Sequence, residues 1–266
     1  MTRPVLGVIA LRITMNNSNQ LSLPPSLDHV RVTGLPYAAF YISDFITEDE
    51  EKLILDKIES APKPRWKQLS RRRLQTWPSD LINNKLVDAP LPSWLEEPIV
   101  SRLLSLPIGQ TAEPSSHIFS SSPHKRPNHV LINEYPPGIG IMPHKDGAAY
   151  HPVVCTVSLR ASICLNIHQT KEDGTLDKNP VSRILQEPRS LLITTGDLYT
   201  EYLHGIDDII EDVNLSEQTI ANWSLLGSKS AFEEGRNLRQ TRTSLTYRDV
   251  ISVSKLSNKL GLFSKK

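Results

Sequence analysis

The segment IMPHKDG at residues 141–147 places a histidine and an aspartate two positions apart, as His144-x-Asp146. At the end of one strand, this spacing lets an imidazole and a carboxylate reach the same metal ion. Two histidines and one carboxylate on one face of Fe(II) leave its remaining positions open, which is the arrangement that oxygenase chemistry needs. A chain of this composition contains about one such pair by chance, so the pair alone does not establish a site.

A third ligand would have to come from a strand that is distant in sequence. His204 closes a predicted strand and precedes Gly205 in the segment YLHG. A histidine at a strand end is more often a buried or surface side chain that binds no metal. His204 is therefore a candidate ligand whose role depends on the fold bringing it to His144 and Asp146.

Two arginines six residues apart, Arg242 and Arg248, lie in the segment RTSLTYR. In an extended strand they share one face with Ser244. A guanidinium group pairs with a carboxylate through two parallel hydrogen bonds, so this face suits a dicarboxylate, although basic strand faces are usually only solvated. Upstream, Asn133 and Tyr135 share a strand face, and both can donate hydrogen bonds to anionic oxygens.

The segment KPRWKQLSRRR holds six cations and no acid. Its candidate substrate-binding residues are Lys63, Arg65, Trp66, Lys67, Arg71, Arg72 and Arg73. Basic side chains bind phosphates, and aromatic rings stack on unpaired bases. The alternative is a solvated loop whose tryptophans, Trp66 and Trp77, pack on the core.

These residues need elements that position them. Thr47 and Glu50 form a Thr-x-x-Glu pattern, which predicts a helix over about 48–60. A second such pattern begins at Ser93 and predicts another helix, with Pro98 limiting the regularity of its first turns.

From His129 onward the sequence consists of short β-branched and aromatic runs separated by Pro, Gly, Asn and Asp. The predicted strands are 130–135, 153–159, 162–167, 190–195, 197–203 and 241–250. Short strands without helical patterns between them favour antiparallel sheets. The sequence therefore predicts an α+β, mainly β fold: a double-stranded β-helix (jelly roll) with the N-terminal helices packed on one sheet.

The 266 residues are nearly balanced in charge, with 30 Lys and Arg against 29 Asp and Glu. This balance excludes a globally basic nucleic-acid coat protein. Two cysteines exclude a disulfide framework and favour a reducing compartment, so we expect a cytoplasmic or nuclear protein. The longest apolar run, VLGVIAL, is far shorter than the roughly 18–20 residues that span a bilayer.

In chain order, the motifs Asn-x-Tyr, His-x-Asp, a later His and Arg-x-Ser resemble those of the AlkB family of Fe(II)/2-oxoglutarate dioxygenases. The surrounding segments LINEYPPGIGIMPHKDG and RTSLTYR carry this resemblance, which covers roughly residues 35–250. The chain looks closest to the sixth homologue branch of that family, through APKPRWKQLSRRRLQTW, GIMPHKDG and LHGI.

The resemblance implies that His144, Asp146 and His204 hold Fe(II) and form the catalytic centre. It implies that 2-oxoglutarate chelates the iron and leaves one position for O2. The expected reaction releases succinate and CO2 and hydroxylates a substrate C–H bond. At an N-methyl group this hydroxylation would release formaldehyde.

The same resemblance implies roles in cosubstrate binding for five residues. Arg242 would pair with the distal carboxylate of 2-oxoglutarate, and Arg248 would lie near its other carboxylate. Hydrogen bonds would come from Asn133, Tyr135 and Ser244.

The motif order predicts one domain with two distinct ends. We expect a flexible N-terminal extension at 1–34, a dioxygenase domain at 35–255 and a basic tail at 256–266. Within the domain, 63–80 is a candidate nucleotide-recognition lid, and 168–189 and 205–240 are predicted loop insertions. A targeting role for residues 1–27 stays open.

Three hypotheses on function follow. The first is oxidative demethylation of alkylated DNA or RNA. The second keeps the dioxygenase but gives it a protein or small-molecule substrate, since the total charge is neutral and 205–240 begins with acidic residues. The third is a noncatalytic jelly roll that binds nucleic acid or a protein. In each case we expect a monomer without a membrane span.

Overall fold

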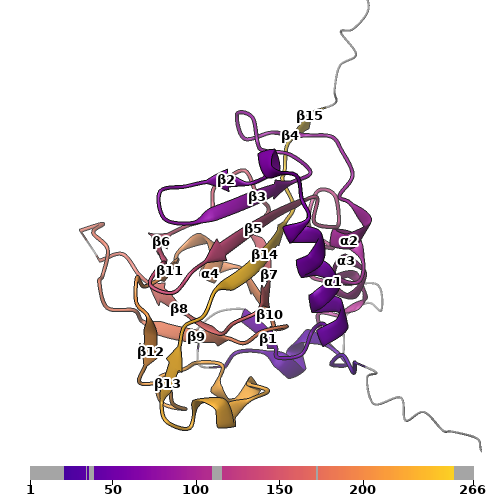
Figure 1. The fold of residues 1–266 in the computed structure, drawn as a ribbon. Helices are drawn as coiled ribbons and strands as arrows, with labels where there is room; N and C mark the ends of the chain where they lie inside the picture. Colours follow the sequence, from indigo (N-terminus) through magenta and orange to yellow (C-terminus); the bar gives the residue numbers. More distant parts are fainter. Residues whose placement is uncertain (1–20, 34, 36–38, 110–115, 172, 255–266) are drawn as a thin grey trace, which may run out of the picture.

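Two antiparallel sheets face each other in the computed structural model (Figure 1). The structure describes residues 21–33, 35, 39–109, 116–171 and 173–254. The larger sheet has seven strands in the order β1-β10-β7-β14-β5-β3-β2, and the smaller has four in the order β6-β11-β8-β9. This arrangement confirms the predicted mainly β jelly roll.

The strands fall into these two sheets and two short pairs. The larger sheet contains β1 (Ala39–Ile42), β10 (Leu191–Thr195), β7 (Val153–Leu159), β14 (Arg242–Arg248), β5 (His129–Tyr135), β3 (Arg73–Trp77) and β2 (Lys67–Gln68). The smaller sheet contains β6 (Ile141–His144), β11 (Leu203–Ile206), β8 (Ile163–His168) and β9 (Ser182–Gln186). The short pairs are β12 (Glu211–Val213) with β13 (Arg236–Leu238) and β4 (Leu86–Val87) with β15 (Val253–Ser254).

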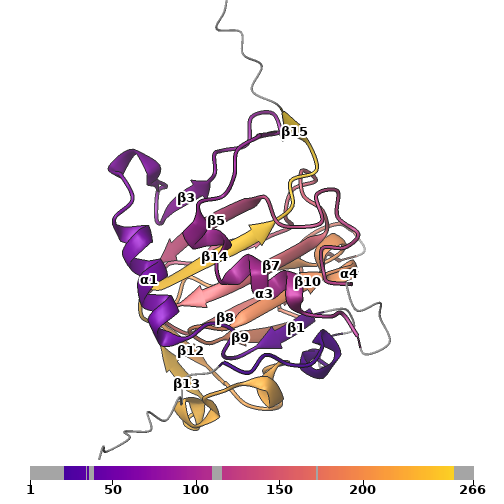
Figure 2. The same ribbon diagram turned by 90° about the vertical axis from the view of Figure 1, so that its right-hand side faces the viewer.

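The helices are short. They are α1 (Glu48–Glu59), α2 (Ser93–Glu96), α3 (Ile99–Ser105) and α4 (Asp197–Thr200), with 3-10 turns η1 (Leu27–Val30), η2 (Lys63–Arg65), η3 (Trp223–Leu225) and η4 (Lys229–Phe232). Helices α1 and α3 lie over the outer face of the larger sheet (Figure 2). The prediction that N-terminal helices pack on one sheet is confirmed.

Strand periodicity divides the larger sheet into an apolar outer face and a polar inner face. In β7, Cys155 and Val157 are buried in the apolar cluster beneath the helices. Thr156 and Ser158 alternate with them and point to the opposite side. In β14, Leu245 belongs to the same outer cluster. The outer face therefore binds the helices by apolar burial, and the inner face is free to carry polar groups.

Helix α1 begins at the predicted capping box. The Thr47 Oγ1 accepts a hydrogen bond from the Glu50 amide at 3.2 Å, and the Glu50 carboxylate accepts one from the Thr47 amide at 2.8 Å. The second predicted capping box is wrong, because Pro92 occupies the N-cap position and Ser93 is already helical. Glu97 is extended before Pro98, as residues before proline usually are, and this divides the predicted helix into α2 and α3.

Three predicted segments differ from the structure. Of the predicted strand 197–203, residues 197–200 form α4 and only Leu203 belongs to a strand, β11, because Gly196 adopts a left-handed φ of +55° that ends β10. The predicted loop insertion 168–189 contains the strand β9. Its residues Ile184 and Leu185 are buried in the second apolar cluster. The predicted insertion 205–240 contains the end of β11 and the pair β12–β13.

The predicted flexible extension is wrong for its described part. Leu27 is fully buried in the outer apolar cluster, and its amide donates to the Pro107 carbonyl at 2.9 Å. Val32 is also buried, and its amide donates to the Ala39 carbonyl. Residues 1–20, most of the possible targeting segment 1–27, lie outside the described residues, as do residue 34 of the predicted extension and the predicted basic tail. No helix among the described residues is long and apolar enough to cross a membrane.

Candidate active site

The inner faces of the two sheets enclose a cavity of about 330 Å³. The larger sheet lines it with Leu131, Asn133, Tyr135, Val154, Thr156, Leu192, Thr194, Arg242, Ser244, Thr246 and Arg248. The smaller sheet and its loops add Ile141, His144, Asp146, Tyr150, Leu165, Ile167, Gln186, Leu198, Tyr199, His204 and Ile206. Arg72 completes the lining. Polar groups therefore converge in a largely apolar space of the size used for small ligands.

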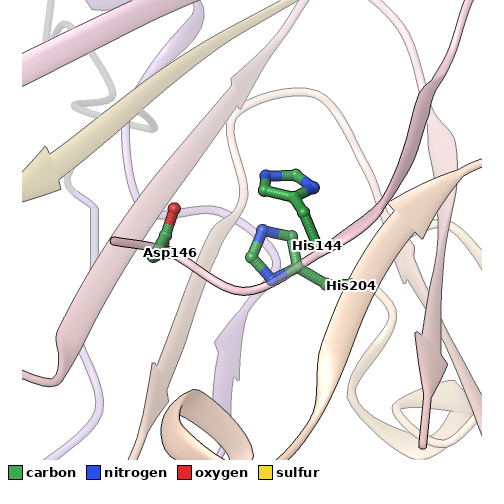
Figure 3. Close-up of side chains that lie close together, drawn as sticks. All are labelled: His144, Asp146 and His204. Carbon is green, nitrogen blue, oxygen red and sulfur yellow. The ribbon is translucent and has the colours of Figure 1, made fainter. Parts of the chain in front are cut away.

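Strands β6 and β11 place two histidines side by side. His204 and His144 are direct partners in the antiparallel register, and their ring centroids are 4.5 Å apart. Asp146 follows in the loop after β6, and its side chain lies beside the two rings (Figure 3). One ligand atom from each of the three residues lies within 4.8 Å of the others. His144, Asp146 and His204 thus form a metal-binding site.

A hydrogen bond orients His144, and burial keeps His204 uncharged. The Nδ1 of His144 lies 2.9 Å from the Met142 carbonyl oxygen and donates to it, so Nε2 is the ring nitrogen left to face a metal ion. Burial lowers the pKa of His204 to about 4, although the nearby Asp146 acts in the opposite direction. His204 is therefore uncharged at neutral pH, as a metal ligand must be.

Glycines allow the two ligand strands to approach closely. A Cβ at Gly140 would lie 1.9 Å from the Ile206 carbonyl oxygen, and a Cβ at Gly205 would lie 2.9 Å from the Pro143 nitrogen. Because real atoms do not approach so closely, any side chain at Gly140 must push β6 away from β11. The spacing between His144 and His204 depends on these two positions.

Gly140→Ala is expected to weaken metal affinity by about 10- to 100-fold, as changes that disturb ligand orientation do. The measurement is a titration of the protein with Mn(II) or Fe(II). Gly147→Ala is the matched control, because its Cβ would meet no atom within 4 Å. Equal metal affinities of the two variants would contradict this role of Gly140.

Asp146 is held in place by an arginine. Arg248 donates to its carboxylate from Nη2 at 2.7 Å and from Nε at 3.2 Å, and both side chains are buried. The same guanidinium lies 4.9 Å from the Tyr150 ring centroid. This two-point contact fixes the carboxylate orientation. Arg248 therefore supports the metal ligand directly.

Arg242 is a buried cation without an acidic partner. Its Nη2 donates to Ser158 Oγ at 2.7 Å and to Gln186 Oε1 at 3.1 Å, both neutral groups. Among the described residues, no carboxylate pairs with it. Burial lowers the pKa of Arg242 to about 10, which still leaves it charged at neutral pH. A buried charge of this kind is costly unless an anion pairs with it, so the cavity suits a ligand carboxylate at this end.

The other predicted cosubstrate residues also line the cavity. Asn133 and Tyr135 on β5 lie opposite Ser244 and Arg242 on β14, as direct partners in register. The guanidinium of Arg242 lies 5.8 Å from the Tyr135 ring centroid. Burial raises the pKa of the Tyr135 hydroxyl, so this group remains a hydrogen-bond donor.

Ser158 and Gln186 contact Arg242 but were not among the predicted site residues. The sequence of β7 could have indicated Ser158 as a cavity residue. Thr156 and Ser158 are the polar residues of this otherwise apolar strand, and they lie two positions apart and so on the same face. Gln186 lies in β9, inside a segment predicted as a loop, and no local pattern marks it. Tyr150 and Tyr199, which line the cavity near Asp146, were also missed.

The basic segment 63–73 folds into η2, β2 and β3, and β3 pairs with β5 of the larger sheet. Three of its cations bind acids from other parts of the chain. These ion pairs are Lys67 with Asp80, Arg71 with Asp208, and Arg73 with Glu134. The candidate lid is therefore an edge extension of the sheet whose charge is partly neutralised.

The tryptophans of this region pack on the core. Trp66 and Trp77 are partly buried against the outer apolar cluster. The guanidinium of Arg73 lies 4.1 Å from the Trp66 ring centroid, and that of Arg65 lies 4.0 Å from Trp77. The packing of the tryptophans agrees with that part of the alternative left open by the sequence, whereas β2 and β3 replace the solvated loop it assumed.

Comparisons with known proteins agree with this geometry. Residues 39–248 match the 2OG-Fe(II) oxygenase superfamily. The chain is 39% identical over 245 residues to "Probable RNA/DNA demethylase ALKBH6" of Danio rerio, covering 88% of this chain and 95% of that protein. It is 28% identical to "Uncharacterized protein L905" of Acanthamoeba polyphaga mimivirus, covering 79% and 83%. The solved structure of OsALKBH1 has the same fold, with a TM-score of 0.50 at 15% identity, covering 81% of this chain and 98% of that one.

Proposed function

We propose that this chain, which belongs to the 2OG-Fe(II) oxygenase superfamily and is thus a 2-oxoglutarate-dependent dioxygenase, demethylates alkylated DNA or RNA by oxidation. The observation that supports a nucleic-acid substrate is the 39% identity, over 88% of the chain, to a Danio rerio protein named as a probable RNA/DNA demethylase. The cavity chemistry supports the cofactors. Three candidate metal ligands meet there, and the buried Arg242 has no acidic partner among the described residues.

The chain's own residues would hold Fe(II) and 2-oxoglutarate together in this cavity. His144, Asp146 and His204 would hold the metal, and Arg242 would take the distal carboxylate of the cosubstrate. When bound, Fe(II) and 2-oxoglutarate with O2 supply oxidative decarboxylation to succinate and CO2 coupled to hydroxylation of a C–H bond. Ser158 and Gln186 would keep Arg242 in position through the hydrogen bonds described above.

The remaining cavity groups would position the cosubstrate and protect the reaction. Arg248 would keep the Asp146 carboxylate turned toward the metal. Asn133, Tyr135 and Ser244 would donate or accept hydrogen bonds along the cosubstrate, since all three line the cavity. The apolar lining from Leu131, Leu165 and other residues would limit the entry of water.

The test is turnover of methylated oligonucleotides. Purified protein with Fe(II), ascorbate and 2-oxoglutarate should release formaldehyde and succinate in equal amounts from methylated DNA or RNA. Unmethylated oligonucleotides of the same sequence serve as the control and should yield no formaldehyde. Absence of formaldehyde with every methylated DNA and RNA tested would contradict the substrate.

A second candidate, a protein or small-molecule substrate, is favoured by the ion pairs of the basic segment. Arg71, Arg73 and Lys67 each bind an acid of this chain and are less available for phosphates. The two candidates differ in salt dependence. Oligonucleotide binding that weakens steeply with salt supports a nucleic-acid substrate, and absent or salt-insensitive binding supports the second candidate.

The third hypothesis, a noncatalytic jelly roll, is disfavoured. The chain belongs to an oxygenase superfamily and retains the complete metal-binding set. A binding module has no use for a buried arginine facing a cosubstrate position.

A further inference from the structure

We infer that Arg72 is the residue of the basic segment that binds substrate, and that it takes a phosphate of the nucleic-acid strand. This inference rests on the proposed function and specifies it. Of the six cations between 63 and 73, only Arg72 lines the cavity. Arg65 donates to the Thr76 and Pro78 carbonyls, and Lys63 is exposed on η2. The remaining three form the ion pairs described above.

The guanidinium of Arg72 is only partly used within the protein. Its Nε donates one long hydrogen bond, 3.4 Å, to Asn133 Oδ1, and its central carbon lies 5.8 Å from the Tyr135 ring centroid. Among the described residues, neither terminal nitrogen of Arg72 has an acidic partner. Four N–H donors in a fixed plane are therefore available to an anion with two oxygens.

Neighbouring contacts hold Arg72 at the boundary between the two sheets. It belongs to the turn between β2 and β3, where the Leu69 amide donates to its carbonyl at 2.8 Å. The preceding residue, Arg71, pairs with Asp208, which follows β11, and approaches the Gly138 carbonyl, which precedes β6. The turn thus reaches from the larger sheet to the strands that carry the metal ligands.

Among the residues that the structure describes, the charges lining the cavity leave Arg72 without a counterion. Three arginines and one carboxylate line the cavity. Asp146 neutralises Arg248, and a cosubstrate carboxylate would neutralise Arg242. Arg72 remains as the third arginine of the cavity lining. A nucleic acid carries one phosphate per nucleotide, so a nucleotide entering the metal site brings a phosphate to this boundary.

The experiment measures binding of a methylated single-stranded oligonucleotide to protein loaded with Fe(II) and 2-oxoglutarate without oxygen. Arg72→Gln is expected to weaken binding about tenfold and to reduce the slope of log affinity against log salt by about 0.7, the value of one single-strand phosphate contact. Arg72→Lys should keep the slope, because it keeps the charge. It should bind the oligonucleotide less tightly than wild type, because lysine lacks the planar guanidinium group that can donate two parallel hydrogen bonds. Lys63→Gln removes the same charge outside the cavity and should change affinity less than twofold.

Each other outcome overturns the inference in a distinct way. An unchanged salt slope in Arg72→Gln means that Arg72 makes no phosphate contact. A tenfold rise in the Kd of 2-oxoglutarate with unchanged oligonucleotide binding assigns Arg72 to the cosubstrate. Equal losses in Arg72→Gln and Lys63→Gln indicate a diffuse electrostatic effect. Wild-type protein that binds no oligonucleotide overturns the proposed function and this inference together, whereas the first three outcomes leave the proposed function intact.

Discussion

His204→Ala is expected to lower kcat/KM by about a thousandfold, equivalent to about 4 kcal/mol of transition-state stabilisation. The reason is that two ligands remain where three are needed to hold the metal with open positions for the reaction. His204 also packs against the His144 ring, so its loss removes the neighbour that orients the second ligand. The measurement combines 2-oxoglutarate turnover with a metal titration, and both should fail in the variant.

His151→Ala is the matched control for this experiment. His151 lies five residues after Asp146, but its contact is with the Ser121 hydroxyl, and it does not belong to the metal-binding cluster. It should retain wild-type turnover and metal affinity. Full activity of His204→Ala would show that the metal is held elsewhere, and loss of activity in both variants would indicate a general effect on this part of the fold.

Arg242→Met is expected to raise the KM for 2-oxoglutarate by about 100-fold, because removing one partner of a buried charge pair costs about 3 kcal/mol. Stability without cosubstrate should not fall, since the substitution removes a buried guanidinium that has only neutral partners. In wild-type protein, 2-oxoglutarate at a hundred times its Kd should stabilise the fold by about 2.7 kcal/mol. In Arg242→Met this stabilisation should largely disappear at the same concentration.

The control for Arg242→Met is Arg236→Met, which removes an exposed guanidinium from β13 outside the cavity. Thermal unfolding with and without 2-oxoglutarate checks both variants. A wild-type response to 2-oxoglutarate in Arg242→Met would show that the cosubstrate carboxylate binds at another group. A large loss of stability in the absence of cosubstrate would show that Arg242 acts mainly in packing.

The strands and the first helix were predictable because their signals are local. In strand β14, Arg242, Ser244, Thr246 and Arg248 alternate with Leu245 and Tyr247. Helix α1 begins at a capping box whose two hydrogen bonds join residues three apart. Strand β9 was missed because its burial comes from neighbouring β8 and not from its own short sequence. The strand predicted at 197–203 failed because Gly196 turned the chain into α4.

The candidate lid shows that the charges of a segment do not by themselves predict a basic surface. Six cations without an acid look like a basic surface, but Arg71, Arg73 and Lys67 find acids that lie 137, 61 and 13 residues away. The partner of a cation depends on which strands pair, and this pairing has no signature in the segment itself. Only Arg72 reaches the cavity, and its neighbours give no reason to single it out.

The sequence by itself determined which residue types this protein could use and in which order, because strand alternation and the spacing of His144-x-Asp146 follow from backbone geometry. Tertiary structure decided which residues meet. The register of β6 with β11 brings His204 to His144 across sixty residues of sequence. The closure of the two sheets places Gln186 on Arg242, and that buried cation pairs with no acid in the part of the chain that the structure describes. Such contacts arise from long-range strand pairing, whose free energy depends on the whole fold and not on any one segment.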